Sequence, residues 1–186
     1  MLKKFKKKVQ HILGNDSANK KIDFENQNIQ LNGKDYLFCR AVIPAIPEIL
    51  SVERAVYNGK TPLNYEVFEK EIQNQHQNLF LLVRYGDRVI AYVSCNYIHK
   101  DACIKDIAIM PRFQRREIAT KMMQLIITEA QKMKCKQVIL DIRQSNLQAQ
   151  KFYSELGFKK EHLKRHYYSD NNEDAYKYIY PLKGEN

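Results

Sequence analysis

The stretch IAIMPRFQRREIATKMMQLIITEAQKMKCKQVILDIRQSNLQAQKFYSELG (residues 107–157) decides the expected fold. It reads as an apolar strand, a turn with a proline, an arginine-bearing loop, a helix, a second strand and a second helix. A loop that opens a helix has free backbone N–H groups, and the helix N-terminus adds about half a positive charge. This arrangement predicts a site for an anion, and for a pyrophosphate group in particular.

Turns and helical patterns organise the rest of the chain. Asn32-Gly33 and Gly86-Asp87 each lie between apolar runs, which is the pattern of a two-residue β-hairpin turn. Two helical patterns, residues 47–58 and 64–75, are separated by Thr61-Pro62. Apolar strands are predicted at residues 79–85, 88–98, 102–110, 137–143, 157–168 and 175–182.

This order of elements predicts an α/β (α+β) fold. Its centre is a mixed, mostly antiparallel sheet with helices on both faces. The helix at residues 117–133 presents one apolar stripe, which we interpret as core packing against the sheet. A capping box of Ser145 with Gln148 is expected to begin the second helix, and Gly157 to end it. The stripe consists of Ile118, Met122, Ile126, Ala130 and Met133.

Length and composition bound the architecture and the surroundings. The chain of 186 residues suits a single domain, predicted to span residues 21–186. Its 31 Lys and Arg residues against 21 Asp and Glu give a formal net charge of +10, which attracts phosphates, acidic proteins and RNA. The four cysteines form no Cys-x-x-Cys pair, so we expect buried thiols in a reducing, cytoplasmic setting and no disulfide framework. No apolar run approaches a membrane span.

Residues 1–20 are predicted to form a basic amphipathic extension and a linker. Apolar residues recur at helical spacing among five lysines in the first thirteen positions, and Gly14 ends the pattern. One interpretation is an anchor for an anionic surface, either the ribosome or a membrane. The other is a solvated or loosely docked terminal helix, and both stay open.

The residues of the central stretch resemble the acetyl-CoA-binding core of the GNAT superfamily of N-acetyltransferases. That family's loop reads Gln/Arg-x-x-Gly-x-Gly/Ala after a strand and a turn, and QRREIA (residues 114–119) stands in its place. The resemblance continues through LDIRQSN (140–146), KFYSELGF (151–158) and the tail RHYYSDNNEDAYKYIYPL (165–182). The tail is similar to the branch of bacterial ribosomal-protein-alanine N-acetyltransferases. Resemblance is strong over residues 100–182, fair over 40–99 and absent before about residue 35.

One position departs from the family pattern. Glu117 stands where the family usually has the first glycine of the loop, so a carboxylate is brought close to a diphosphate. Arg112, Arg115, Arg116 and Lys121 surround it in the sequence and could offset its charge.

The resemblance implies that acetyl-CoA is the co-substrate and indicates which residues hold it. The backbone of the loop would bind the pyrophosphate, and the preceding strand would bind the pantetheine arm as an added strand and supply an oxyanion donor. Asn146 would contact the pantetheine amides, although a plain helix cap explains an asparagine there equally well. The implied residues are Ile107, Ala108, Ile109, Gln114, Arg115, Arg116, Glu117, Ile118, Ala119, Thr120, Asn146 and Tyr153.

Two residues are expected to move protons. Tyr153 matches the branch's general acid, and a phenol with a reference pKa of about 10 is protonated at neutral pH. Asp141 stands where the branch has a glutamate base; the alternative is a strand carboxylate paired with Arg143 or a neighbouring lysine. Glu53 and Asp106 are the fallback bases.

The acceptor is expected to be a primary amine, namely the α-amine of a ribosomal or other protein N-terminus. The alternatives are a small amine, or a non-catalytic module that binds acetyl-CoA or RNA. His162 and His166 are too far apart along a strand to share a metal, so no metal site is predicted. We expect a monomer or a weak dimer.

Overall fold

The computed structural model describes residues 22–182, so the predicted extension at residues 1–20 lies outside the described residues. Within that range the sheet has eight strands in the order β1-β2-β3-β4-β5-β6-β8-β7. The chain runs through β1 (Gln27–Leu31), β2 (Lys34–Arg40), η1 (Ile43–Ala45), α2 (Ile46–Val56), α3 (Tyr65–Gln73), β3 (Asn78–Tyr85), β4 (Arg88–Ile98), β5 (Asp101–Ile109), η2 (Pro111–Phe113), α4 (Ile118–Lys132), β6 (Gln137–Arg143), α5 (Leu147–Glu155), β7 (Lys159–Tyr168) and β8 (Glu173–Pro181).

The predicted hairpins and their neighbours form the antiparallel part of the sheet. β1 and β2 meet at Asn32 and Gly33, with φ of 49° and 73°, and Gly86 at the β3–β4 turn has a φ of 57°. Each of these positions needs the left-handed region that Asn and Gly adopt at low cost. Among the strands within residues 22–182, only β5 and β6 run parallel, which confirms the mixed, mostly antiparallel sheet.

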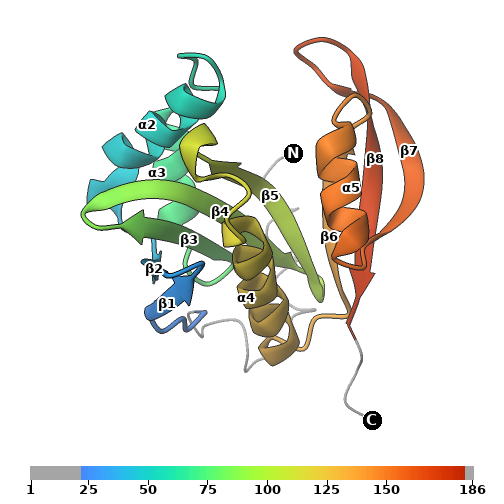
Figure 1. Ribbon diagram of the computed structural model, residues 1–186. Helices are drawn as coiled ribbons and strands as arrows, with labels where there is room; N and C mark the ends of the chain where they lie inside the picture. Colours follow the sequence, from blue (N-terminus) through green and yellow to red (C-terminus); the bar gives the residue numbers. More distant parts are fainter. Residues whose placement is uncertain (1–21, 183–186) are drawn as a thin grey trace, which may run out of the picture.

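Helices cover both faces of the sheet, as predicted (Figure 1). α2 and α3 enclose one apolar cluster with the inner sides of β3 and β4, centred on Ile49, Phe68 and Tyr92. α4 packs over the other face and buries Met122 and Ile126. Two apolar cores therefore hold the sheet, and its strands β3 and β4 are buried on both sides.

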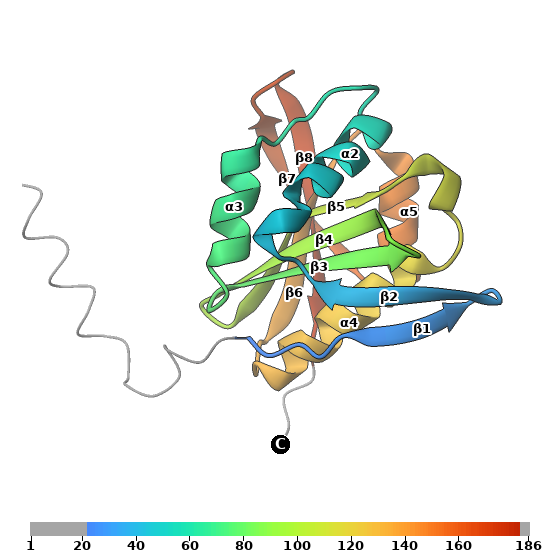
Figure 2. The ribbon, with the colours of Figure 1, turned by 90° about the vertical axis from the view of Figure 1, so that its left-hand side faces the viewer.

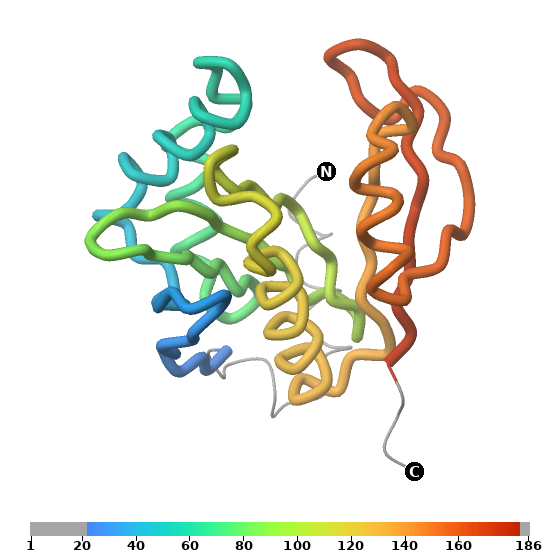
Figure 3. The backbone as a smooth tube through the Cα atoms, in the orientation of Figure 1, coloured from blue at the N-terminus to red at the C-terminus, as the bar shows by residue number. Residues whose placement is uncertain are grey.

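β5 and β6 separate along their length. They pair only from Asp101 to Cys103 on one strand and from Gln137 to Ile139 on the other. Beyond these residues the two strands diverge, and β6 continues with β8 and β7 as a separate wing of the sheet (Figures 1 and 3). The main chain of β5 after Cys103 is thus left with one edge free of a neighbouring strand.

A β-bulge interrupts β5 just where it leaves β6. Ser94 pairs with Asp106 and Cys95 with Ile104, so Lys105 is an extra residue on β5. Before the bulge, Ile104 belongs to the core under α4; after it, Ala108 belongs to the core under α2. The extra residue thus exchanges the two faces of the strand, as a bulge does by breaking the two-residue alternation.

Two local predictions were wrong. Met133, expected on the apolar stripe of α4, follows the helix as its C-cap and is 41% exposed. The cap of α5 is Asn146, whose side chain accepts from the Ala149 N–H at 3.0 Å, and no Ser145–Gln148 capping box forms.

The predicted burial of the thiols holds for three of the four cysteines, since Cys103 is half-buried. All four are free. No helix within residues 22–182 is long and apolar enough to cross a membrane.

Candidate active site

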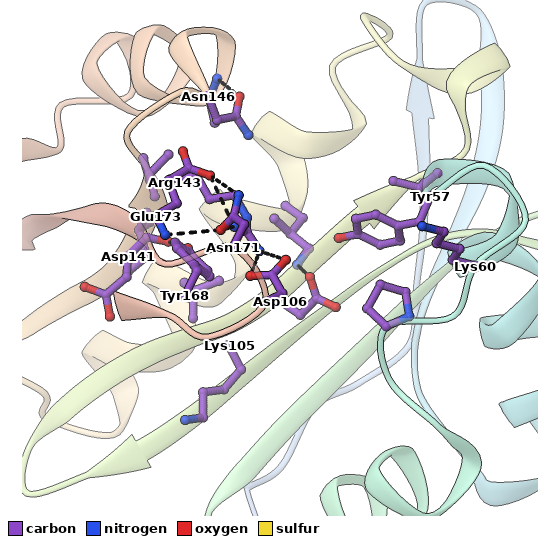
Figure 4. A pocket seen from close by; sticks show the side chains of 18 of the residues that line it. Tyr57, Lys60, Lys105, Asp106, Asp141, Arg143, Asn146, Tyr168, Asn171 and Glu173 are labelled. Atoms are coloured by element: carbon purple, nitrogen blue, oxygen red, sulfur yellow. Dashed lines mark hydrogen bonds and ion pairs between the residues drawn. The ribbon is translucent and has the colours of Figure 1, made fainter. Parts of the chain in front are cut away.

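A cleft of about 690 Å³ opens where β5 and β6 separate. One wall comes from β5 and the α2–α3 connection; the other comes from β6, the start of α5 and the β7–β8 turn (Figure 4). Both predicted catalytic residues, Tyr153 and Asp141, line this cleft. Among those lining the cleft are Tyr57, Lys60, Lys105, Asp106, Ile107, Asp141, Arg143, Asn146, Tyr153, Tyr168, Asp170, Asn171 and Glu173.

The loop before α4 has the geometry of an anion site. Arg115 and Glu117 both have a left-handed backbone, with φ of 57° and 64°, so the chain turns sharply before the helix. Within residues 22–182, the backbone N–H groups of residues 117–120 donate to no acceptor, while that of Lys121 donates to the Glu117 carbonyl at 2.9 Å. A diphosphate fits this set of free donors at the start of a 15-residue helix.

Glu117 occupies the position where a left-handed backbone favours glycine. Its side chain is exposed, and it forms no ion pair with Arg112 or Lys121 in the described part of the chain. The departure from the family pattern therefore has a backbone component as well as a charge component, since a residue with a Cβ is strained at this φ.

The free edge of β5 faces the cleft. Met110 donates its N–H to Ile90 of β4 at 2.9 Å, so the alternation of an antiparallel pair directs the backbone groups of Ile107 and Ile109 away from β4. The Gln114 side chain donates to the Ile109 carbonyl at 3.0 Å and braces the loop against the strand. The Ile107 N–H is held by the Asp106 carboxyl at 2.8 Å. An extended amide-bearing chain fits this edge, with the Ile109 N–H as an available donor.

Asn146 both caps α5 and lines the cleft. Its side-chain oxygen is used by the Ala149 N–H, which leaves the amide NH₂ to face the cleft (Figure 4). The two interpretations of this residue are compatible, because capping uses the oxygen and a ligand would use the nitrogen.

Tyr153 reaches the cleft from α5 and is 5% exposed. Its ring packs edge-on against Phe152 and Phe158, with centroids 5.0 Å and 5.4 Å away. Burial, with a smaller contribution from the Asp106 charge, raises the pKa of Tyr153 above the ordinary value of a phenol. The hydroxyl therefore keeps its proton at any physiological pH, as a general acid requires.

Asp141 lies on β6 and is bound to a cation. The Lys164 Nζ lies 2.8 Å from the Asp141 Oδ2, and Lys164 also stacks over the Tyr167 ring at 4.7 Å. Burial and the Asp141 charge raise the pKa of Tyr167 to about 12. The geometry thus realises the alternative of a strand carboxylate paired with a lysine, and Arg143 is not the partner.

Asp106 lies on β5 in different surroundings. The Tyr92 hydroxyl lies 2.5 Å from the Asp106 Oδ2 and also contacts the fully buried Glu53 carboxyl. Burial, opposed by the Tyr92 hydrogen bond and reinforced by the Glu53 charge, raises the pKa of Asp106 to about 6. Tyr92 has one hydroxyl hydrogen for two carboxyls, so one carboxyl carries a proton when both hydrogen bonds form.

Sequence reasoning named Asp106 and Glu53 only as reserves and missed Tyr92. These three residues come from β5, α2 and β4, and no local motif links them. The signal that could have found Tyr92 is a tyrosine in the middle of an otherwise apolar strand, where its hydroxyl needs a buried partner.

The outer end of the cleft is lined by polar and aromatic groups. Arg143 binds Asp170 through two oxygens at 2.9 Å and 3.0 Å and Glu173 at 3.2 Å. Glu173 also accepts from the Ser145 N–H at 2.8 Å, and these hydrogen bonds, those of Ser145 and Asn171 above all, lower its pKa to about 2. Its charge is therefore already compensated. Asp174, the next residue, accepts from the His166 N–H at 2.8 Å.

No group of three or more His, Cys, Asp or Glu side chains in residues 22–182 is arranged to hold a metal ion. His162 pairs instead with its neighbour Glu161, at 3.1 Å.

Comparison with known proteins agrees with this geometry. The sequence profile of the Acetyltransferase (GNAT) family matches residues 45–158. The chain belongs to the GNAT family. Its cleft and loop are thus those of a family of acetyltransferases, and the resemblance seen in the sequence is confirmed.

Two curated relatives show how far the similarity extends. The [ribosomal protein bS18]-alanine N-acetyltransferase of Haemophilus ducreyi is 32% identical over 82 residues, which cover 44% of this chain and 57% of that protein. The N-alpha-acetyltransferase of Sulfurisphaera tokodaii is 26% identical over 163 residues, which cover 81% of this chain and 95% of that protein.

Solved structures share the fold. The ribosomal-protein-S18-alanine N-acetyltransferase of Escherichia coli superposes with a TM-score of 0.71 at 22% identity, over 81% of this chain and 97% of that one. Arabidopsis thaliana NAA60, solved with a bisubstrate analogue, gives a TM-score of 0.71 at 13% identity, over 81% of this chain and 99% of that one.

Proposed function

We propose that this GNAT protein transfers an acetyl group from acetyl-CoA to the α-amine of a protein N-terminus. The observation that carries the proposal is the cleft between β5 and β6, which brings together Asp106, Ile107, Asp141, Asn146 and Tyr153. β5, whose free edge borders the cleft, leads into the loop of free N–H groups at the start of α4, and Asp106, a carboxyl with a raised pKa, lies on the same strand.

Acetyl-CoA, when bound, supplies an activated acyl group on a thioester sulfur. The backbone N–H groups of residues 117–120 hold its diphosphate, and the free edge of β5 orients its pantetheine arm. The Ile109 N–H, on the edge of β5 that points away from β4, stabilises the negative charge that develops on the acyl oxygen. Tyr153 then donates its hydroxyl proton to the departing sulfur.

The structure favours Asp106 as the general base. A base works best when its pKa lies near the operating pH, and the pKa of Asp106 is raised to about 6. Asp141 is the competing assignment, and its Oδ2 is already engaged in an ion pair with the Lys164 Nζ at 2.8 Å. In the favoured scheme the Asp106 carboxylate takes the proton from the amine, and Tyr92 and Glu53 hold the carboxyl in place.

The strength of this base favours α-amines over lysine side chains. Removing a proton from an α-amine, with a reference pKa of about 8, by a base of pKa about 6 costs about 3 kcal/mol. The same step for a lysine, with a reference pKa of about 10.4, costs about 6 kcal/mol. The names of the curated relatives also support an N-terminal acceptor.

The test uses the full chain with acetyl-CoA and two matched peptides. One peptide has a free N-terminal alanine and no lysine; the other has a blocked N-terminus and one internal lysine. Mass spectrometry should find acetyl groups on the first and far fewer on the second. Acetylation of the lysine alone, or of a polyamine in preference to both peptides, would contradict the acceptor, and no product at high protein concentration would contradict the activity.

A further inference from the structure

A second pocket, of about 400 Å³, lies outside the cleft and collects basic and aromatic side chains. Three separate segments build it: the β1–β2 turn, the β3–β4 hairpin and the segment between β5 and α4. Figure 2 shows the three gathered at one end of the molecule. We call this site the basic pocket; it is lined by Lys34, Tyr85, Arg88, Ile90, Arg112, Phe113 and Arg116.

Cations outnumber every other kind of side chain in the basic pocket. Four of its seven lining residues are cations, and no Asp or Glu is among them. In the part of the chain that the structure describes, none of the four forms an ion pair, whereas Arg84 next to the pocket is paired with Glu48 at 2.6 Å. Lys34, Arg88 and Arg112 are also exposed. Cations held together without carboxylates repel one another, so the site gains free energy when an anion enters.

Aromatic rings hold the cations in position. The guanidinium carbons of Arg112 and Arg116 lie 5.1 Å and 5.4 Å from the centre of the Phe113 ring. The Lys34 Nζ lies 5.8 Å from the centre of the Tyr85 ring. Such contacts fix the direction of the charged groups before a ligand arrives, which lowers the entropic cost of binding.

Tyr85 offers a surface for stacking. It is 39% exposed, and its ring is supported by Tyr36 and Phe113, whose centroids lie 5.4 Å and 5.7 Å away. A supported and exposed aromatic ring among unpaired arginines is the combination with which proteins bind single-stranded nucleic acid, since phosphates meet the cations and a base stacks on the ring.

We propose that the basic pocket binds single-stranded RNA through its phosphodiester backbone and one stacked base. An acidic peptide would use the cations but not the exposed ring. The cations come from three segments along the rim and suit a strand that crosses the site, and three of them are arginines, whose planar guanidinium groups match phosphate oxygens. The proposal does not depend on the acetyl-transfer activity.

The test measures binding of a fluorescein-labelled, uridine-rich RNA of twelve nucleotides by fluorescence anisotropy across a series of salt concentrations. The double variant Arg88→Ala/Arg112→Ala removes two cations from the pocket and leaves the proposed acetyl-CoA loop unchanged. We expect its affinity near 100 mM salt to fall about tenfold or more, and the slope of log K against log salt to become shallower by about 1.4. Tyr85→Leu should weaken binding about 5- to 100-fold with the slope unchanged.

The matched control is Lys159→Ala/Arg165→Ala, which removes the same charge from exposed positions on β7. All variants keep residues 1–20, so any contribution of the lysine-rich extension is the same throughout. Equal losses in the pocket and control variants would overturn the proposal, since bulk charge would then explain the binding. Displacement of the RNA by stoichiometric acetyl-CoA, or by poly-glutamate as readily as by unlabelled RNA, would also overturn it. Thermal melting of each variant verifies that it is folded.

Discussion

Asp106 and Asp141 lie on the two strands that line the cleft, and their carboxyl groups have different surroundings. On β6, Asp141 faces the ammonium group of Lys164 at 2.8 Å. On β5, Asp106 faces a tyrosine hydroxyl and a second buried carboxyl, Glu53, and has no cation bound to it in the described residues. A cation stabilises an ionised carboxylate, whereas burial and a like charge favour the protonated form. Position beside a reaction therefore does not make a carboxyl a base; its neighbours do.

The largest expected effect concerns Tyr153, which is the proposed general acid whichever of the two carboxyls is the base. Tyr153→Phe removes the proposed general acid and should lower kcat by about 10²- to 10³-fold with the acetyl-CoA affinity almost unchanged. Steady-state kinetics with isothermal titration of acetyl-CoA separates the two quantities. If the variant instead loses its cooperative melt, Tyr153 acts in the core and not in the reaction.

Replacing the β5 carboxyl tests whether Asp106 is the general base. Asp106→Asn should lower kcat/KM by about 10²-fold, because an amide cannot accept the amine proton. In the wild-type protein, activity should rise with pH through about 6, the pKa of Asp106, and this step should be missing in the variant. A variant with the wild-type pH profile would transfer the base role to Asp141.

The same substitution should stabilise the protein at high pH. The pKa of Asp106 is higher in the folded protein than the ordinary 3.8, so stability that is present at pH 4 is lost as the pH rises through about 6. The Asp106→Asn variant has no charge to bury. Its free energy of unfolding minus that of the wild type should therefore be about 1 to 3 kcal/mol larger at pH 8 than at pH 4. Urea unfolding at the two pH values measures the difference, and equal values would mean that the carboxyl is solvated.

The loop before α4 is expected to respond more weakly. Glu117→Gly removes a negative charge beside the proposed diphosphate site and relieves a left-handed φ of 64°. We expect acetyl-CoA to bind about fivefold more tightly, most clearly at low salt. Glu117→Gln is the matched control, because it removes the charge and keeps the strained backbone. Weaker binding by the glycine variant would show that the Glu117 side chain supports the loop.

The smallest expected effect belongs to the β6 carboxyl. If Asp141 is a paired structural carboxylate, Asp141→Asn and Lys164→Met should each change kcat by less than about threefold, apart from any loss of stability. Measuring kcat for both at several pH values checks this. A large loss of kcat with Asp141→Asn, together with a shifted pH profile for Lys164→Met, would show that Asp141 and not Asp106 is the general base.

Features set by neighbouring residues were predicted from the sequence. The Asn32-Gly33 and Gly86-Asp87 turns are found as expected, because a two-residue hairpin turn constrains φ at those positions. The loop at residues 114–119 and the helix after it were predicted for the same reason, since the free N–H groups of a helix N-terminus follow from local geometry.

Features set by residues far apart in the chain were not predicted. The Tyr92–Glu53 contact joins positions 39 residues apart, and Lys164 reaches Asp141 across 23 residues. No periodicity in a single segment carries this information, because it arises when α2 packs on β4 and when β7 pairs with β8, which lies between β7 and β6. The exact end of a helix was not predicted either. α4 stops at Lys132, and Met133, which follows it, is exposed.

The bulge at Lys105 determines which residues of β5 face each side of the sheet. Upstream of it, even-numbered residues of β5 face the core under α4; downstream, even-numbered residues face α2. If the same residues formed a regular strand without the bulge, the alternation would continue from Ile104. Asp106 would then face the apolar core under α4, and Ile107 would face Tyr92. Deleting Lys105 would instead remove the bulge and leave Asp106 opposite Ser94, so the extra residue is what lets this sequence place its carboxyl beside Tyr92.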